Sequence, residues 1–285
     1  MKKTILFLAV ILLIAGCKKN QQGTTPVKVH VNNFSIVQEE IPSSKGVPVG
    51  SYTNVKNITL AFYADDGTEV YKHIQVRDDE TTYDTFGEFD CALPMGTYTM
   101  VVIGYGGDTP FNLTSPTSAV CMDTRLQDTF SATQSVTVTN NNGVEINTSL
   151  DRVVSRLGVV STDQRVAEAT QMRMTFTGGG RDFNPTTGLA LTNTGFANTI
   201  SFAAEVGSTV SVASYLFLAT DEQTMNVTVE TLDDDDNTLF NETLNNLPFQ
   251  RNRMTKLTGM VFSSNAAAGS FIINNDWLPE YNEPL

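Results

Sequence analysis

The sequence predicts an all-β fold made of two tandem β-sandwiches. Three observations support this prediction: short segments alternate apolar and polar residues, turn-forming residues separate them, and the segments fall into two series of about seven strands each. The chain has 285 residues, of which 40% are hydrophobic, and this is enough apolar material for a core in each half.

In the first series, apolar positions change parity between Val31 and Phe34. We therefore expect a bulge at Asn32-Asn33 that turns both parts of the first strand toward one core. Asp65-Asp66-Gly67 predicts a tight hairpin turn, because glycine readily adopts positive φ. The expected strands are 27–36, 56–64, 68–76, 86–93, 96–104, 130–139 and 149–160.

Ser161-Thr162-Asp163 interrupts this alternation and divides two expected domains, 26–160 and 161–285. Residues 164–170 fit a short helical turn with Ser161 or Thr162 as its N-cap. The second series of expected strands then follows: 171–177, 199–205, 209–220, 225–232, 239–244, 253–262 and 270–274.

The N-terminus has the pattern of an export signal. Two lysines precede an apolar run, 4–16, that is too short to span a bilayer as a helix. Residues 13–17 (LIAGC) resemble the lipobox of bacterial lipoproteins. This resemblance implies removal of the signal peptide 1–16, acylation (palmitate included) of Cys17, and a lipidated tether over 17–25 that holds the protein at the outer membrane. The alternative is an ordinary signal peptide with an incidental cysteine.

The charge excludes one class of partner. Loss of Lys2 and Lys3 with the signal would change the formal net charge from −13 to −15, and so acidic a chain is unsuited to binding nucleic acid.

Cys91 alternates with Phe89 and Leu93, which predicts a buried thiol. Export also permits a disulfide between Cys91 and Cys121. Sequence spacing alone does not decide between free thiols and a disulfide.

No sequence motif indicates catalysis, a metal or a cofactor. Asp233-Asp234-Asp235-Asp236-Asn237 lacks the alternating ligand spacing of a calcium loop and predicts a solvated hairpin turn. Gly178-Gly179-Gly180-Arg181 lacks the Gly-Lys-Ser/Thr of a phosphate-binding loop. His30 and His73 fall in separate strands, and neither is assigned a role beyond that of a strand residue.

Four residue runs carry a family resemblance. Residues 55–67, 93–102, 150–158 and 250–259 are similar, in this order, to segments of the fimbrillins of Bacteroidales, the FimA/FimB and Mfa-like subunits of type V pili. The resemblance implies two transthyretin-like β-sandwiches. It also implies a non-enzymatic fimbrial subunit or accessory lipoprotein used in adhesion, whose partners are other fimbrial subunits and a host or bacterial surface ligand.

Assembly in this family implies addition of a β-strand from a neighbouring subunit. The exchangeable first strand would present Val27, Val29, Val31, Phe34 and Ile36.

One departure from the family pattern bears on this role. Shaft subunits of the family are cut after an arginine that follows the first strand, whereas this chain has no arginine before Arg77. The expected loop 38–51 offers only Lys45 as a basic cleavage residue. The tail 276–285 contains two prolines, which cannot donate to a strand ladder. These features favour an anchor or accessory subunit that keeps its first strand.

Two rival functions remain open at this point. A surface glycan-binding lipoprotein would need exposed aromatic residues, for which Phe62, Tyr63, Tyr71 and Tyr83 are candidates, although strand aromatics more often form cross-strand pairs. A secreted hydrolase would need two convergent carboxylates, which the sequence does not locate.

Overall fold

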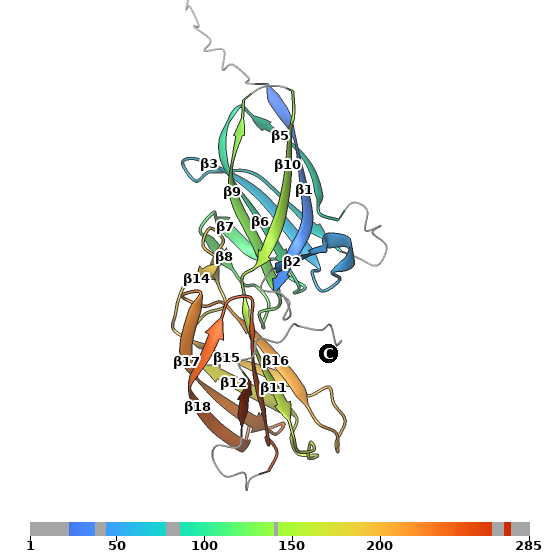
Figure 1. Cartoon of the computed structure of the whole chain (residues 1–285), viewed down its shortest axis with the longest axis vertical. Coiled ribbons are helices and arrows are strands. Elements are labelled where there is room, and N and C mark those ends of the chain that lie inside the picture. The colour runs from blue at the N-terminus through green and yellow to red at the C-terminus, as the bar shows by residue number, and fades with distance from the viewer. Residues whose placement is uncertain (1–22, 38–43, 78–85, 140–141, 264–270, 275–285) are drawn as a thin grey trace, which may run out of the picture.

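The computed structural model describes residues 23–37, 44–77, 86–139, 142–263 and 271–274. Within these ranges the chain is almost entirely β-structure, and one 3-10 helix, η1 (Val49–Ser51), is present. Two β-lobes follow one another along the long axis, with a small sheet between them (Figure 1). The predicted all-β fold is confirmed.

The first lobe is a sheet of eight strands folded into two layers. The strand order is β2-β1-β10-β9-β6-β3-β4, and β5 also pairs with β1. Strands β9 and β10 are paired only at Asp151–Ser131 and Arg152–Phe130, so the sheet turns a corner there. The bounds are β1 (Thr24–Val37), β2 (Ser44–Pro48), β3 (Asn57–Ala64), β4 (Glu69–Val76), β5 (Glu88–Pro94), β6 (Gly96–Tyr105), β9 (Thr129–Val138) and β10 (Val144–Arg152).

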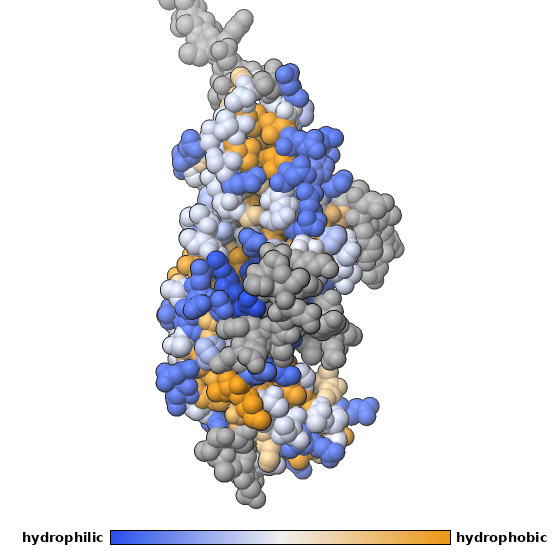
Figure 2. Space-filling view, in the orientation of Figure 1, coloured by the Kyte–Doolittle hydropathy of each residue, from blue (hydrophilic) through white to orange (hydrophobic). Residues whose placement is uncertain are grey.

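Beyond this corner the two layers diverge, with one apolar core between them. Figure 2 shows an apolar area on the upper lobe, in the region where Figure 1 places the gap between β9 and β10. The inward side chains of these two strands include Val136, Val138 and Ile146, which belong to the core. The layers therefore form a sandwich that is closed at one corner and splayed at the other end.

Local sequence signals in the first lobe agree with the structure. The pairing of β1 with β10 shifts register between Val31 and Asn33, which is the predicted bulge. The Asp65–Gly67 turn connects β3 to β4, with Gly67 at φ 83° and its amide donating to the carbonyl of Ala64 over 2.8 Å. Both predictions are confirmed.

The second lobe packs two four-stranded sheets face to face. One has the order β16-β11-β19-β20 and the other β15-β12-β17-β18, and a second apolar core lies between them. The bounds are β11 (Ser155–Ser161), β12 (Gln171–Phe176), β15 (Phe196–Ser201), β16 (Ser211–Leu216), β17 (Glu222–Leu232), β18 (Thr238–Gln250), β19 (Met254–Gly259) and β20 (Ile272–Asn274).

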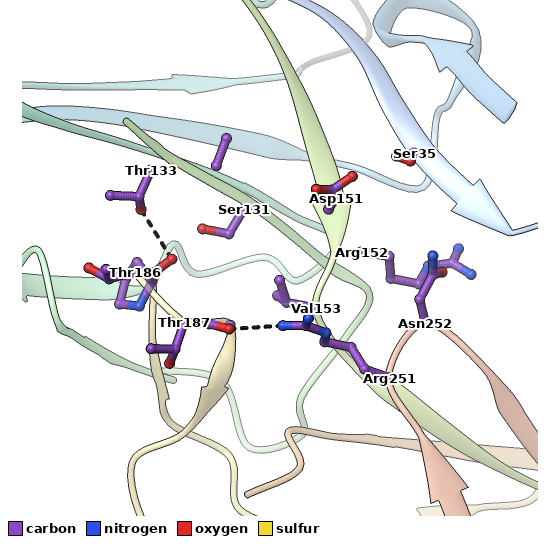
Figure 3. Close-up of a pocket in the computed structure, with 13 residues that line it drawn as sticks. Ser35, Ser131, Thr133, Asp151, Arg152, Val153, Thr186, Thr187, Arg251 and Asn252 are labelled. Atoms are coloured by element: carbon purple, nitrogen blue, oxygen red, sulfur yellow. Dashed lines mark hydrogen bonds between the residues drawn. The ribbon is translucent and has the colours of Figure 1, made fainter. Parts of the chain in front are cut away.

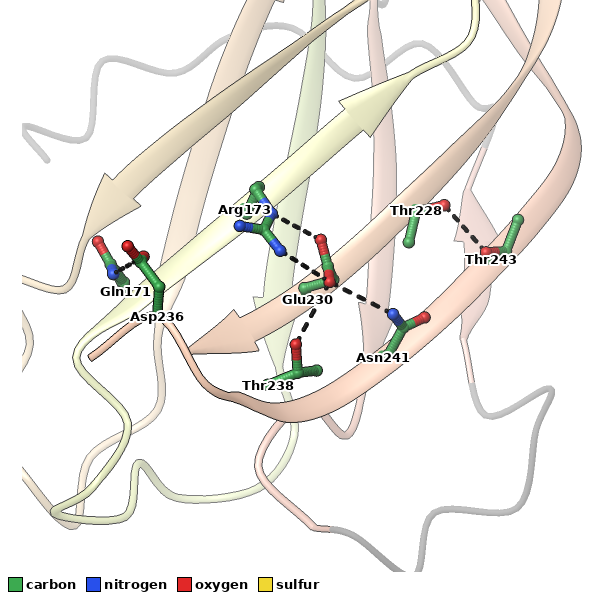
Figure 4. Close-up of polar contacts among 8 residues, drawn as sticks. All are labelled: Gln171, Arg173, Thr228, Glu230, Asp236, Thr238, Asn241 and Thr243. Atoms are coloured by element: carbon green, nitrogen blue, oxygen red, sulfur yellow. Dashed lines mark hydrogen bonds and ion pairs between the residues drawn. The ribbon is translucent and has the colours of Figure 1, made fainter. Parts of the chain in front are cut away.

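A polar network covers the outer face of one of these sheets (Figure 4). Arg173 of β12 donates to both carboxylate oxygens of Glu230 on β17, over 2.7 and 3.0 Å. Thr238 and Asn241 of β18 also donate to Glu230. The guanidinium of Arg173 holds the pKa of this carboxyl below its usual value. The network thus ties three adjacent strands together through their side chains.

Three expectations at the junction of the lobes differ from the structure. The single strand predicted over 149–160 is two strands: β10 pairs within the first lobe and β11 within the second. The chain crosses between them at Val153 and Val154, earlier than the expected boundary at residue 161, and both side chains are buried. Residues 164–170 form an irregular segment with a turn at 167–168 instead of the helical turn that their capping residues allowed.

A third apolar cluster joins the lobes. It lies on the outer face of β3 and β6, under a small sheet ordered β14-β13-β8-β7, whose strands come from both halves of the chain. Sequence patterns did not predict these strands, because each has only two to four residues. Their bounds are β7 (Asn112–Ser115), β8 (Ser118–Val120), β13 (Phe183–Asn184) and β14 (Leu189–Ala190).

Candidate functional site

Strand β1 is the first candidate site, and it lies inside its layer. Its backbone runs parallel to β10 along one side. Along the other side it is antiparallel to β5 from Thr24 to His30 and to β2 from Asn33 to Val37. Because both sides are paired, removing β1 would leave a groove between β10 and the two strands opposite it.

The alternate side chains of β1 fill the core of the first lobe. Val27, Val29, Val31 and Phe34 are 1%, 0%, 6% and 0% exposed, which confirms the predicted burial of these four side chains. Burial of the fifth, Ile36, stays a prediction. The ring of Phe34 lies 4.8 Å from that of Phe130 and 5.7 Å from that of Tyr52, centroid to centroid. Burial of such side chains contributes about 1.5–3 kcal/mol each, so apolar packing dominates the retention of this strand.

The outward side chains of β1 hold it only weakly. Lys28 lies 3.9 Å from Asp90 of β5, and both side chains are largely exposed. His30 lies 3.9 Å from Glu88 and 3.6 Å from Glu145. An exposed ion pair such as Lys28–Asp90 contributes about 0–1 kcal/mol. The strand is therefore bound mainly by its main chain and its four buried side chains, which another strand of similar pattern could supply.

The candidate cleavage residue Lys45 lies in a strand. We expected residues 38–51 to form a loop, but the backbone of Lys45 belongs to β2 and pairs with that of Ile36. β2 pairs with β1 here because β5 stops pairing at His30. Proteases prefer exposed loop tips. Cleavage at Lys45 stays a prediction, and it would require β2 to leave the sheet. Cys17 lies outside the described residues, so its lipidation also stays a prediction.

A buried ion pair fixes the corner where β9 meets β10. Arg152 Nη2 donates to Asp128 Oδ2 and to the hydroxyl of Tyr52, over 2.8 Å in each case. The Tyr52 hydroxyl donates to the same carboxylate oxygen over 2.6 Å. The side chains of Arg152 and Asp128 are only 7% and 5% exposed. Removing one partner of such a pair costs about 3–5 kcal/mol, because the other charge stays buried.

A polar pocket of about 450 Å³ opens beside this corner, between the two lobes (Figure 3). Strands β9 and β10 and the end of β1 form one wall, and turns of the second half form the other. Sequence reasoning missed this site, because its residues come from separate segments with no shared local pattern. The lining residues are Ser35, Ser131, Ala132, Thr133, Asp151, Arg152, Val153, Pro185, Thr186, Thr187, Gly188, Arg251 and Asn252.

The aromatic candidates for a glycan platform are mostly core residues. Phe62 and Tyr63 are fully buried, and Tyr71 packs partly buried against the first core. Phe62 and Tyr71 are cross-strand partners with ring centroids 6.2 Å apart. Tyr83 lies outside the described residues. The expectation of cross-strand pairing is confirmed for Phe62 and Tyr71.

The acidic run forms the predicted hairpin turn. The carboxylate of Asp233 accepts hydrogen bonds from the amides of Asp235 and Asn237, over 2.9 and 2.8 Å. In the part of the chain that the structure describes, no group of three or more His, Cys, Asp or Glu side chains is placed to hold a metal ion.

Both described cysteines are free thiols. Cys91 is half-buried in β5, and burial raises the pKa of its thiol to about 11. Cys121 lies 3.7 Å from the hydroxyl of Tyr105, sulfur to oxygen. Of the two alternatives left open by the spacing, the unpaired thiols are confirmed.

Fold and site together define a tandem β-sandwich protein whose first strand is paired on both sides and contributes to the first core. Residues 28–283 match the model of a family of unknown function, DUF6562, and the chain belongs to this family. No curated protein matches the sequence. Among the described residues, no helix is both long enough and apolar enough to cross a membrane.

Several solved structures have a similar fold. A candidate cell adhesion protein from Bacteroides fragilis superposes with a TM-score of 0.52 at 12% identity, over 88% of this chain and 96% of that one. A candidate adhesin from Bacteroides thetaiotaomicron gives 0.51 at 14% identity, over 90% and 97%. The fimbrial anchor protein Mfa2 from Porphyromonas gingivalis gives 0.48 at 13% identity, over 90% and 99%. At these identities the likeness extends to the fold alone, and it rests on the first two structures, whose TM-scores are higher.

Proposed function

We propose that this protein is a non-enzymatic fimbrial component that acts in cell adhesion and joins neighbouring subunits by β-strand addition. We further propose that it is an anchor or accessory subunit, held at the outer membrane by lipid on Cys17. The observation that carries the proposal is β1, a strand paired on both sides whose alternate side chains fill the first core. Strand addition needs this combination of main-chain pairing and side-chain pockets.

The positions of the nearest basic residues after β1 support its retention. Lys45 is held in β2, and Arg77, the first arginine, donates to the main-chain carbonyls of Val55 and Val49 over 3.0 and 2.9 Å. Arg77 also follows β4, so cleavage there would remove four strands and not β1 alone. Neither basic residue offers a free loop bond whose cleavage would release only the first strand.

The position of the lipid also distinguishes a subunit that keeps β1 from one that loses it by cleavage. Cys17 and β1 lie on the same side of any cleavage that frees the groove, so such a cleavage would also separate the protein from its lipid. Fewer than ten residues separate Cys17 from Thr24, a reach of about 25 Å when extended. A subunit that keeps β1 therefore stays close to the membrane, as an anchor must.

The test is mass spectrometry of the N-terminus of the protein taken from native fimbriae or membranes. We expect acylated Cys17 followed by an intact β1. A mature N-terminus beyond Val37 would refute the anchor role and indicate a processed subunit that accepts a neighbouring strand.

Membrane fractionation tests the lipid separately. Cys17→Ala is expected to move the protein out of the membrane fraction, whereas the control Cys91→Ala is expected to leave it there, because Cys91 belongs to the folded first lobe. Membrane retention of the Cys17→Ala variant would contradict the lipid anchor.

A further inference from the structure

The pocket between the lobes is built by turns whose conformation is fixed. Gly188 has φ +72°, and a Cβ atom there would lie 2.8 Å from Nη1 of Arg251 and 2.9 Å from Cγ1 of Val153. The amide of Thr186 donates to Oδ1 of Asn184 over 2.9 Å, which shapes the same turn. The pocket wall at Gly188 therefore depends on a residue without a side chain.

Contacts across the pocket hold its two sides in place. Thr133 of β9 donates through its hydroxyl to the carbonyl of Pro185 over 3.1 Å. Arg251 Nη1 donates to the carbonyl of Thr187 over 2.8 Å (Figure 3). The cavity is thus framed by hydrogen bonds between segments that lie far apart in the sequence.

The charges that line the pocket are balanced by neighbouring acids. Arg152 pairs with Asp128 and Arg251 with Asp221, over 2.8 and 2.9 Å. Asp151 adds an exposed carboxylate to the lining. Two guanidinium groups thus face three carboxylates, so the site does not favour an anion. A neutral polar ligand fits this balance.

Two buried polar atoms at the pocket lack a hydrogen-bond partner among the described residues. They are the hydroxyl oxygen of Ser131, a residue only 5% exposed, and Oδ1 of Asn252. In Figure 3 the hydroxyl of Ser131 points from β9 toward Thr186 on the opposite wall. A buried polar atom without a partner costs about 1–3 kcal/mol, and a bound ligand would remove that cost.

We propose that this pocket binds a short neutral saccharide. Serine and threonine hydroxyls both donate and accept hydrogen bonds, as sugar hydroxyls do. Five residues that carry such a hydroxyl line the cavity: Ser35, Ser131, Thr133, Thr186 and Thr187. The three threonine hydroxyls already donate to carbonyls of the protein, so they would accept hydrogen bonds from a sugar, whereas the Ser131 hydroxyl would do both. Ala132, Val153 and Pro185 add an apolar surface for the C–H face of a sugar ring. The volume lies in the range of small-ligand pockets, about 300–1,000 Å³.

The proposal concerns an adhesive ligand, but it does not depend on the fimbrial role. Binding is measured on the isolated full-length protein, so its failure leaves the N-terminal test untouched. The probes are glucose, galactose, mannose, N-acetylglucosamine, maltose and lactose, with sodium phosphate as the anionic comparison. Isothermal titration is followed for each probe up to about 20 mM, a concentration suited to millimolar affinities.

We expect at least one sugar to bind and phosphate not to bind. Ser131→Ala should weaken sugar binding by about ten-fold, because one hydrogen bond is lost. The same variant should melt at the same or a higher temperature, since it removes a buried hydroxyl that has no protein partner. Ser135→Ala is the matched control, an exposed serine on the same strand outside the pocket, and it should bind like the unchanged protein.

Three outcomes would overturn the proposal. They are absence of binding for every sugar probe, binding of phosphate in their place, and equal sugar affinity of the Ser131→Ala and Ser135→Ala variants. The third outcome would show that the sugar binds elsewhere on the molecule. The melting temperature of the Ser131→Ala variant separates the two causes of lost binding. If it is unchanged, the loss of binding is not due to a loss of stability.

Discussion

Truncation of Phe34 is the sharpest test of β1 as a core element. The Phe34→Ala change removes a ring that is 0% exposed and packs against Phe130 and Tyr52. It removes no charged or hydrogen-bonding group and leaves the main chain of β1 able to pair. Any loss of stability therefore reports the side-chain packing that holds the strand in its groove.

The size of the effect follows from how tightly the ring is enclosed. A Cβ atom at Gly104 would lie 2.9 Å from Cε1 of Phe34, so β6 passes directly over the ring. The surrounding strands are fixed by their ladders and cannot collapse into the space. Truncating a buried phenylalanine costs about 3–5 kcal/mol, and we expect a value in the upper part of that range.

Urea unfolding provides the assay. The free energy of unfolding falls by about 2 kcal/mol per molar urea, so the expected loss of stability lowers the urea concentration at the unfolding midpoint by about 2 M. Hydrogen exchange of the β10 and β5 amides should rise in parallel, because these strands pair with β1. The control is Val76→Ala on β4, where the side chain is 56% exposed and the cost should be within about 0.5 kcal/mol. A midpoint shift no larger than that of the control would refute the role of β1 as a core strand.

Two further predictions concern titratable groups. The lowered pKa of Glu230 stabilises the fold above the usual pKa of a glutamate, and this gain is lost as the pH falls through the lowered value. Glu230→Gln should therefore cost about 1 kcal/mol in urea unfolding at neutral pH and nothing in strong acid, and an equal cost in both conditions would contradict the ion pair. With a thiol pKa of about 11, Cys91 should be about one part in a thousand thiolate at pH 8. Iodoacetamide should then modify Cys91 slowly until the protein is unfolded, and rapid modification of the folded protein would show the thiol to be exposed.

Much of the fold follows from local sequence patterns. Alternation locates the long strands because their two faces meet different environments, and it locates the bulge at Asn32-Asn33 because parity must be restored there. The buried face of β1 was predictable for the same reason. In contrast, Gly46 and Pro48 within β2 are typical of a loop, so a strand pairing that depends on tertiary contacts was missed.

The junction between the lobes could not be predicted from local patterns. Val153 and Val154 are both buried, so the crossing from β10 to β11 continues the apolar pattern of the strands on either side. The small central sheet is too short to show periodicity. The pocket beside it draws on β1, β9, β10 and two distant turns, and its chemistry exists only once these segments have been brought together.

The shared cluster between the lobes makes the two sandwiches thermodynamically interdependent. Phe111 from the first half packs edge-on against Phe183 and Phe217 from the second. Phe183 and Phe217 stack on each other, and Tyr105 packs edge-on against Phe111. Either half alone would expose this aromatic surface, and a fragment ending at residue 160 would also carry most of β11 without β16 and β19. The chain should therefore melt in a single cooperative transition. Tension along its long axis would also load this aromatic contact. We therefore expect the two sandwiches to resist force as one unit.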